Sequence, residues 1–393
     1  MVSYDKLGND QHAVIDEIGR LGARPIWVKG HAGSGKSIVL LHSLSDYLIK
    51  KPNALVCVVG YTRSLVQLLN TGIKEIPALK ERTIQVYTAN GVIVAIKDGK
   101  KYDAIFCDEV QDLPIEHIQL MKQSCTHLVL AGDPNQSIYT SIPLDALSPV
   151  SMKPLIEADF ISRFTPVEKS LSVIYRLKRN ILQLIRNGIN SFLVDMNVAG
   201  SDNVDVSLVK ASSIESEISY TWQKAKEDNV LRRDKTFAFL FYGKGDLLKY
   251  INEVLSIENK PRWEVKYDRF ENPNYNDLNW HLEQNEIPIM VLSNGAGNLD
   301  VLARKNKIAF ITYHSAKGLD FNYVFLPMIG ESLSFREGDP IQSIILVALS
   351  RSSGGLAISY TGEMNEHFKP FLSSLTAFDI DSSNQEEDDD VLF

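Results

Sequence analysis

The feature that most restricts the fold of this sequence is a glycine-rich loop between an apolar run and an amphipathic run. Residues 30–37 read Gly-His-Ala-Gly-Ser-Gly-Lys-Ser, after the apolar segment Pro25–Val28 and before the amphipathic segment Ser37–Leu48. In a strand–loop–helix of this kind, glycines allow backbone N–H groups to converge on phosphate oxygens at the start of the helix. The pattern therefore predicts a nucleotide site in which Lys36 supplies positive charge and Ser37 ligates Mg²⁺.

A second motif supplies carboxylates at the end of another apolar run. It reads Cys107-Asp108-Glu109-Val110-Gln111-Asp112. We expect Asp108 to hold Mg²⁺ through its water shell and Glu109 to orient and deprotonate the attacking water. Gln136, after the following apolar run, is a candidate sensor of the γ-phosphate or of that water. The alternative is a surface cluster of acids that caps a helix over Leu113–Cys125, a role open to Asp112.

Strand-like apolar runs alternate with helical runs along most of the chain. In the first half the strand-like runs are Pro25–Val28, Ala54–Val59, Ile84–Tyr87, Ala104–Cys107 and His127–Leu130. In the second half they are Val204–Val209, Thr236–Phe241, Pro288–Leu292, Ile308–Thr312, Tyr323–Pro327 and Leu356–Tyr360, with helical runs such as Glu215–Glu227 and Asp246–Leu255. The alternation predicts an α/β fold with parallel sheets that helices cover on both faces. The proline-containing stretch Ser141–Pro166 predicts a connection between domains.

Composition excludes little, but it locates two features. Seven acidic residues and no basic ones lie from Asp379 onward, so they account for all but one of the eight net negative charges. A nearly neutral body neither requires nor forbids a nucleic-acid partner.

The three cysteines, Cys57, Cys107 and Cys125, lie in or beside expected strands, so we expect them to be core residues of a protein in a reducing compartment. With no apolar run of membrane-spanning length and no signal-peptide pattern, we expect a cytoplasmic protein without a membrane partner.

In their order along the chain, these and several further motifs resemble those of superfamily 1 helicases of the UvrD/Rep type, from Gln11 to about Gly362. The further matches are Gln11 (Q motif), Gly60–Arg63 (motif Ia), Val86–Gly91 (Ib), Gly132–Tyr139 (III), Tyr175-Arg176 (IV), Thr312–Phe321 (V) and Val347–Arg351 (VI). Each short motif is unspecific by itself, whereas their joint occurrence in the family's order is specific.

The resemblance implies ATP and Mg²⁺ as cofactors and assigns residues to them. Contacts to ATP are implied for Gln11, Gly30, Ala32, Gly33, Ser34, Gly35, Lys36, Ser37, Tyr175, Gly318 and Asp320, and metal contacts for Ser37 and Asp108. Gln11 would read adenine and Tyr175 would stack on it. Lys36, Glu109, Gln136, Arg176 and Arg351 would be catalytic, Arg351 as an arginine finger.

The resemblance also implies a fold, a substrate and a direction. Two RecA-like domains are expected at residues 1–165 and 166–376, the second carrying Arg176 and Arg351. From the run of acids we separately expect an acidic disordered tail at 377–393. Single-stranded DNA, with RNA left open, would contact Tyr61, Thr62, Arg63, Thr88, Asn90, Tyr139, Thr312 and His314. The implied function is an ATP-dependent helicase or single-stranded DNA translocase that moves 3′-to-5′.

Three departures from the family pattern modify this expectation. Only Thr71–Thr83 separates motif Ia from motif Ib, which is too short for the subdomain that relatives insert there. Ser141 stands where relatives carry a base-stacking aromatic, and Ile38 where they carry an arginine near adenine. We therefore expect a compact motor with doubtful unwinding capacity and less certain selection of ATP. The alternative function is a nucleic-acid-responsive ATPase switch that regulates a partner nuclease or effector.

For two segments the sequence allows two interpretations each, one in which the segment binds a partner and one in which it does not. The aromatic stretch Arg262–Glu286 could stack on bases, but its few basic residues favour packing within its own domain. The terminal residues Glu386–Phe393 combine acids with a final Val-Leu-Phe and could dock a protein partner or compete with DNA. The alternative for this end is a solubilising tail.

Overall fold

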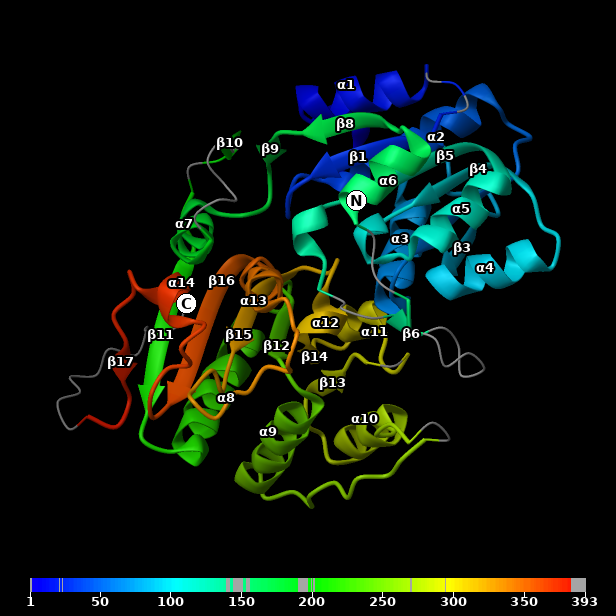
Figure 1. The fold of residues 1–393 in the computed structure, drawn as a ribbon. Coiled ribbons are helices and arrows are strands. Elements are labelled where there is room, and N and C mark those ends of the chain that lie inside the picture. Colours follow the sequence, from blue (N-terminus) through cyan, green and yellow to red (C-terminus); the bar gives the residue numbers. More distant parts are fainter. Residues whose placement is uncertain are drawn as a thin grey trace. The chain divides into compact units, whose positions relative to one another are not determined.

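The computed structural model describes residues 2–20, 22, 24–138, 142–143, 151–152, 156–189, 197–198, 200, 202–268, 271–293 and 295–382. The chain forms two compact units. The first runs to Arg176 and also includes the short strand β10 (Asn197–Val198) and Gly338–Ser343. The second is made from the other described residues from Leu177 onward. Each unit is built on one parallel β-sheet, so the predicted α/β class is confirmed (Figure 1).

The first unit contains a six-stranded sheet in which every pairing is parallel. Across the sheet its strands are β3 (Gln85–Thr88), β2 (Val56–Gly60), β4 (Tyr102–Cys107), β5 (Cys125–Gly132), β1 (Ile26–Gly30) and β8 (Val167–Leu171). In this order β5 lies between β1, which leads into the glycine-rich loop, and β4, which leads into the acidic motif. The carboxyl ends of these three strands therefore meet at one edge of the sheet.

Helices cover both faces of the first sheet, as the near-continuous apolar strands predict. The helices are α1 (Asn9–Ile18), α2 (Lys36–Lys50), α3 (Arg63–Glu75), α4 (Ala89–Lys97), α5 (Ile115–Gln123) and α6 (Glu157–Phe164). Along β1, Ile26 and Val28 pack in the core beneath α1, α2 and α3, whereas Trp27 packs in the core beneath α4, α5 and α6. Single turns of 3₁₀ helix and two short strand pairs complete the unit: η1 (Tyr4–Lys6), η2 (Val110–Asp112), η3 (Pro134–Gln136), β6 (Ile142–Pro143) with β7 (Ser151–Met152), and β9 (Val173–Ile174) with β10.

The first unit extends beyond the expected boundary at residue 165. Part of the stretch expected as a connection forms α6, and the next residues form β8, which pairs with β1 along its whole length. Tyr175 and Arg176, expected on the second domain, also belong to the first unit. The sequence did not predict β8 as a strand, because Glu168 and Lys169 interrupt its apolar pattern. Charged residues of this kind are common in strands at the edge of a sheet, where β8 lies.

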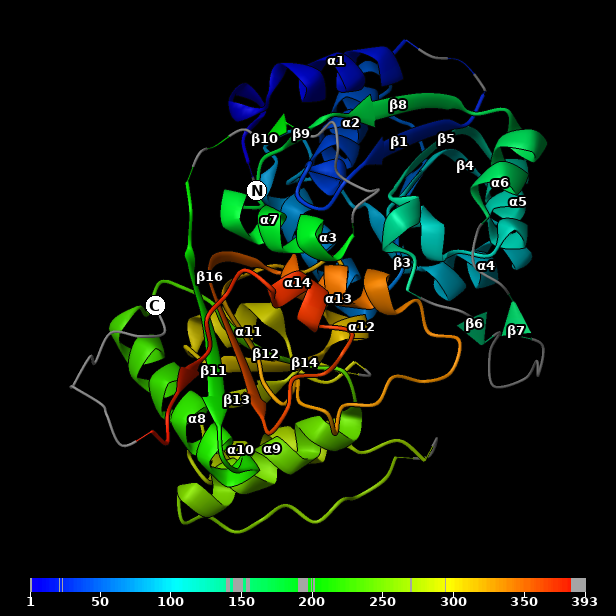
Figure 2. The ribbon, with the colours of Figure 1, turned by 60° about the vertical axis from the view of Figure 1, so that its left-hand side comes forward.

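The second unit contains a seven-stranded parallel sheet. Its strands in spatial order are β13 (Ile289–Val291), β14 (Ile308–Thr312), β12 (Phe237–Phe241), β15 (Phe321–Leu326), β16 (Ser352–Thr361), β11 (Asp205–Ala211) and β17 (Phe378–Asp379). Its helices are α7 (Arg179–Gly188), α8 (Ile214–Leu231), α9 (Lys244–Ile257), α10 (Tyr275–Gln284), α11 (Leu299–Arg304), α12 (Tyr313–Ala316), α13 (Ile341–Leu349) and α14 (Lys369–Leu372). Figure 2 shows α8, α9 and α10 together on one face of this sheet, where they bury Trp222, Tyr250 and Leu278.

Two sequence expectations for the second unit need adjustment. In the aromatic stretch, Trp263 and Tyr275 are buried as the packing interpretation predicts, whereas Tyr267 and Trp280 are exposed. The expected tail begins later than residue 377, because β17 pairs with β11 and Asp381 accepts hydrogen bonds from the Ser212 N–H (2.6 Å) and the Ser216 hydroxyl (2.8 Å). The acidic residues from Glu386 onward lie outside the described residues.

Cys57 and Cys107 are core residues, as predicted, and Cys125 is half-buried at the start of β5. All three are free thiols. None of the helices in the described part of the chain combines the length and the apolarity that crossing a bilayer needs.

Candidate active site

The glycine-rich segment forms the expected turn between β1 and α2, and we call residues 30–37 the phosphate loop. Gly33 and Gly35 adopt positive φ angles of 80° and 87°, which side chains rarely allow. Gly35 is the N-cap of α2, so Lys36 and Ser37 begin the helix. The Lys36 ammonium folds back over the loop and donates to the carbonyl oxygens of Gly30 (2.7 Å) and His31 (3.2 Å). The loop thus presents helix N–H groups and one cation at the same place, as an anion site requires.

Ser37 and Asp108 meet across the edge of the sheet, as predicted. The Ser37 hydroxyl donates to Asp108 Oδ2 at 2.5 Å. Asp108 is buried, and burial together with the neighbouring Glu109 carboxylate raises its pKa to about 6. One hydroxyl and one carboxylate form an oxygen donor set that suits Mg²⁺ held jointly with nucleotide phosphates. Ser37 and Asp108 are the residues that would hold the ion.

Glu109 lies beside Asp108 in an unusual backbone conformation. Its φ is 55°, a left-handed value that costs energy for a residue with a side chain and is often found at functional sites. The Glu109 N–H donates to Asp108 Oδ1 at 3.0 Å, and its own carboxylate accepts from Gln111 Nε2 at 2.5 Å. The helix that follows begins at Ile115 with Pro114 as N-cap and has no side-chain cap, so Asp112 does not cap it. The alternative interpretation, in which these acids cap the following helix, is therefore wrong.

Gln111, which the sequence interpretation left without a function, joins the acidic motif to the end of β5. Its Nε2 donates to Glu109, and its Oε1 accepts from the Asp133 N–H at 3.1 Å. A Cβ on Gly132 would lie 2.4 Å from Gln111 Oε1 and 2.8 Å from Val110 Cγ1. The Gln111 side chain therefore fits over position 132 only when that residue is glycine. The one sequence signal for this link was the glutamine's position two residues after the glutamate.

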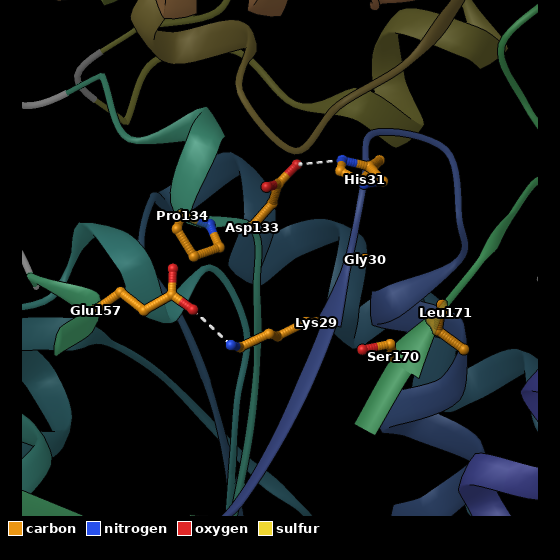
Figure 3. Close-up of a pocket in the computed structure, with 8 residues that line it drawn as sticks. All are labelled: Lys29, Gly30, His31, Asp133, Pro134, Glu157, Ser170 and Leu171. Carbon is orange, nitrogen blue, oxygen red and sulfur yellow. Dashed lines mark hydrogen bonds and ion pairs between the residues drawn. The ribbon is translucent and has the colours of Figure 1, made fainter. Parts of the chain in front are cut away.

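Gln136 is held by Asp133. Its Nε2 donates to Asp133 Oδ2 at 2.7 Å, and the same carboxylate oxygen lies 3.7 Å from His31 Nδ1. These partners and the charge of Lys36 lower the pKa of Asp133 despite its burial. Figure 3 shows His31 and Asp133 pointing toward each other, and both line a cavity of about 230 Å³. Asp133 thereby connects the candidate sensor with the phosphate loop.

Two other residues that line this cavity, Lys29 and Glu157, belong to an ion-pair cluster that the sequence did not reveal. Lys29, on β1, contacts Glu157 of α6 at 2.5 Å and also pairs with Glu168 of β8 (Figure 3). Its ammonium lies 4.4 Å from the centroid of the Trp27 ring. Because two carboxylates and a ring share this one cation, Lys29 fixes the edge of the sheet and does not act as an anion site.

Gln11 and Tyr175 approach the phosphate loop from two segments outside it. The buried Gln11 side chain donates from Nε2 to the Ser34 carbonyl oxygen at 2.9 Å. The N–H groups of Tyr175 and Arg176 both donate to the Gly33 carbonyl oxygen, at 2.9 and 3.2 Å. The Tyr175 hydroxyl donates to Asp10 Oδ1 at 2.5 Å, and burial and this partner raise its pKa. The structure therefore brings Gln11, Tyr175 and Arg176 together at the loop.

In the second unit, Arg351 lies beside the loop that contains Gly318 and Asp320. Its guanidinium is buried and donates to Leu319 O (2.9 Å), Val347 O (2.9 Å) and Ser350 Oγ (2.7 Å). Gly318 has a φ of 80°, and Asp320 is exposed. Arg351 and the Gly318–Asp320 segment thus form one cluster of the second unit, in which the arginine positions the loop.

Most residues predicted to contact nucleic acid lie at strand-to-helix turns. Thr62, Thr88 and Thr312 are the N-caps of α3, α4 and α12, and each accepts from an N–H of its own helix. Gly60 and Thr88 pair across β2 and β3, so the exposed Arg63 and Asn90 lie at the same edge of the first sheet. Tyr61 is partly buried against the core, and the His314 ring lies 6.3 Å from that of Tyr242. Tyr139 lies outside the described residues.

Residues 26–164 match the viral superfamily 1 RNA helicase core domain. This segment holds the phosphate loop, the acidic motif and Gln136, and it is about a third of the chain. The match confirms the superfamily 1 resemblance for this segment, whereas the UvrD/Rep subtype stays a prediction. No curated protein sequence matches the chain.

Two solved helicase structures are similar to the chain. One is the structure of the PRRSV helicase, with a TM-score of 0.43 and 13% identity, covering 89% of this chain and 54% of that one. The other is a complex of arterivirus nonstructural protein 10 (helicase) with DNA, with a TM-score of 0.45 and 14% identity, covering 92% of this chain and 65% of that one. The chain thus spans less than two thirds of either neighbour.

Proposed function

We propose that this protein is an ATP hydrolase of the superfamily 1 helicase type that moves along single-stranded nucleic acid. One observation carries the proposal: side chains at the carboxyl ends of β1, β5 and β4 form a connected site. Ser37 meets Asp108, Glu109 meets Gln111, and Gln111 meets Asp133, which holds Gln136. The segment that contains these residues is also the one that matches a helicase core.

The residues divide the chemistry among them. Backbone N–H groups of the phosphate loop and the Lys36 ammonium bind the β- and γ-phosphates. Mg²⁺, when bound by Ser37 and Asp108, supplies charge that stabilises the leaving group. Glu109 takes the proton of the attacking water, and Gln111 fixes the orientation of its carboxylate. Gln136 hydrogen-bonds the γ-phosphate or that water, from a position set by Asp133.

Further features of the proposal come from the sequence resemblance. Arg176 and Arg351 stabilise the charge of the transferring phosphoryl group, Arg351 from the second unit as an arginine finger. Single-stranded DNA contacts the helix-capping turns at Thr62, Thr88 and Thr312, and movement runs 3′-to-5′. Because α3 ends at Glu75 and β3 begins at Gln85, the first unit carries no inserted subdomain there. That observation favours translocation or nucleic-acid-gated ATP hydrolysis over strand separation.

The deciding experiment measures ATP hydrolysis of the full chain with and without single-stranded DNA and RNA. We expect stimulation by single-stranded DNA that falls steeply between 50 and 200 mM salt, because phosphate contacts release counterions. Lys36→Ala and Glu109→Gln should both abolish turnover, and Glu109→Gln should still bind nucleotide. Retained hydrolysis in Glu109→Gln would contradict its role as base.

The switch function is the second candidate, and the short first unit favours it. It predicts stimulated hydrolysis without directional movement on a tethered strand. A streptavidin-displacement assay on strands biotinylated at either end separates the two: displacement from one end supports the motor, and none from either end supports the switch.

A further inference from the structure

The Gln11 side chain uses both ends of its amide within the protein. Its Oε1 accepts from the Gly8 N–H at 3.0 Å, which is the bond that the N3 residue makes in a capping box at the start of α1. Its Nε2 donates to the Ser34 carbonyl oxygen at 2.9 Å. The side chain is 4% exposed. A glutamine that reads a base must instead present its amide to that base in a hydrogen-bonding plane.

The Nε2 atom lies directly against the tightest point of the phosphate loop. A Cβ added to Gly35 would come within 2.3 Å of Gln11 Nε2. Gly35 is the left-handed N-cap of α2, so its conformation decides where the helix N–H groups point. Gln11 therefore holds the residues on both sides of the Ser34–Gly35 peptide in the anion-binding arrangement.

Two side chains of the first unit, Tyr175 and Ile38, offer the base a ring and an apolar side chain. Tyr175 is 39% exposed, and its hydroxyl is tied to Asp10 at 2.5 Å, so its ring is presented in a fixed orientation. Stacking on a ring tolerates every base, because every base has a π-face. Ile38, at the position where the sequence resemblance leads one to expect an arginine, packs against the core of the first unit.

From these contacts we infer that Gln11 is a positioning residue for the phosphate loop and that the protein accepts nucleoside triphosphates with little regard to the base. The inference rests on the proposed nucleotide hydrolysis and gives Gln11 a different role from the adenine reader that the resemblance implies. Recognition is directed at the triphosphate, through a loop that Gln11 holds in shape. The base is bound only by stacking.

The test compares wild type, Gln11→Ala and Gln11→Glu with ATP, GTP, CTP and UTP as substrates and inorganic tripolyphosphate as a base-free inhibitor. Wild type should hydrolyse the four nucleotides with kcat/KM values within about tenfold of one another, because no hydrogen bond selects the base. In Gln11→Ala, we expect KM for all four to rise by a similar factor, about tenfold, because a buried hydrogen bond to the loop is lost. The inhibition constant of tripolyphosphate should rise by the same factor.

Gln11→Glu separates the loop bond from the helix cap. Glutamate is a preferred residue at this capping-box position, so the bond to Gly8 and the thermal stability should be retained. A carboxylate cannot donate to the Ser34 carbonyl oxygen, so KM and the tripolyphosphate inhibition constant should still rise as in Gln11→Ala.

The outcomes distinguish the two claims. If either variant loses ATP hydrolysis selectively while GTP and tripolyphosphate are unaffected, Gln11 reads adenine and the inference is overturned, although the proposed hydrolysis stands. If wild type itself strongly prefers ATP, the inference is likewise overturned. If wild type hydrolyses none of the four nucleotides, the proposed function fails, and the inference falls with it.

Discussion

At the scale of single residues, the site depends on side chains that act through one another. Gln111 acts through its neighbours: it sets the orientation of Glu109 and the position of the Asp133 backbone. The Gln111 link also explains a glycine, because the amide crosses directly over Gly132. Adding one carbon atom at Gly132 therefore tests how firmly the Gln111 side chain is held.

Gly132→Ala should destabilise the fold by about 1–3 kcal/mol, because its Cβ would overlap Gln111 and Val110. It should also reduce ATP hydrolysis by displacing the amide that holds Glu109. Gly245→Ala in α9 is the matched control, since a Cβ there meets nothing within 4 Å and should stabilise by about 0.4–1 kcal/mol. Urea unfolding and steady-state hydrolysis provide the measurements. Unchanged stability in Gly132→Ala would show that Gln111 moves aside freely.

His127 gives the first unit a dependence of stability on pH. It is buried on β5 with its ring stacked 5.4 Å from that of Tyr47, and burial lowers its pKa. At a pH just below the unfolded pKa of about 6.5, the imidazole is therefore protonated in the unfolded chain and still neutral in the folded protein. The free energy of unfolding should fall as pH drops from 7.5 to 5, by at most about 1.4 kcal/mol per pH unit from this group.

His127→Phe removes that contribution and keeps a ring against Tyr47. The difference in unfolding free energy between variant and wild type should grow in favour of the variant as pH falls, as urea unfolding at each pH would show. A difference that stays constant with pH would assign the dependence to other groups.

At the scale of elements, the sequence predicted the interior strands and one edge strand of each sheet, β3 and β13, and missed the opposite edge strands, β8 and β17. The strands that carry the site were predicted because two helical layers require apolar residues on both strand faces, as for Trp27 and Val28. Strand β8 was missed because Glu168 and Lys169 resemble a loop, although Glu168 pairs with Lys29. Strand β17 has two residues and no pattern of its own. Partners such as Gln111 and His31 depend on tertiary contacts that no local pattern contains.

Glu217 attaches α8 to the second sheet through three donors. The buried carboxylate accepts from the Met328 N–H (2.6 Å) and the hydroxyls of Ser359 and Thr361 (both 2.7 Å). Glu217→Ala would leave one buried and two partly buried donors without this acceptor and should cost about 3 kcal/mol of stability. Glu227→Gln, on the exposed face of the same helix, should change stability by less than about 0.5 kcal/mol. Equal effects of the two substitutions in urea unfolding would contradict the role of Glu217.

At the scale of the whole molecule, the proposal assigns the phosphate loop to the first unit and the arginine finger to the second. Arg351→Lys should lower kcat by about 10³ or more while nucleotide affinity changes far less, because the guanidinium acts in the transition state. Since the same group holds Leu319 and Ser350, the substitution should also destabilise the second unit.

Ser350→Ala is the control for that structural effect, because it removes one partner of Arg351 and leaves the guanidinium in place. It should lower thermal stability modestly and retain most of the hydrolysis rate. Equal losses of rate in Arg351→Lys and Ser350→Ala would assign Arg351 a structural role alone.

The two N–H groups that grip the Gly33 carbonyl belong to the last residues before the chain passes from one unit to the other. The first of several covalent connections between the units is thus anchored at the turn that a triphosphate would occupy. A shift of that turn when a ligand binds or dissociates would therefore displace Tyr175 and Arg176, where this connection begins. Under the proposed function, nucleotide at the loop would act on this connection through backbone hydrogen bonds alone.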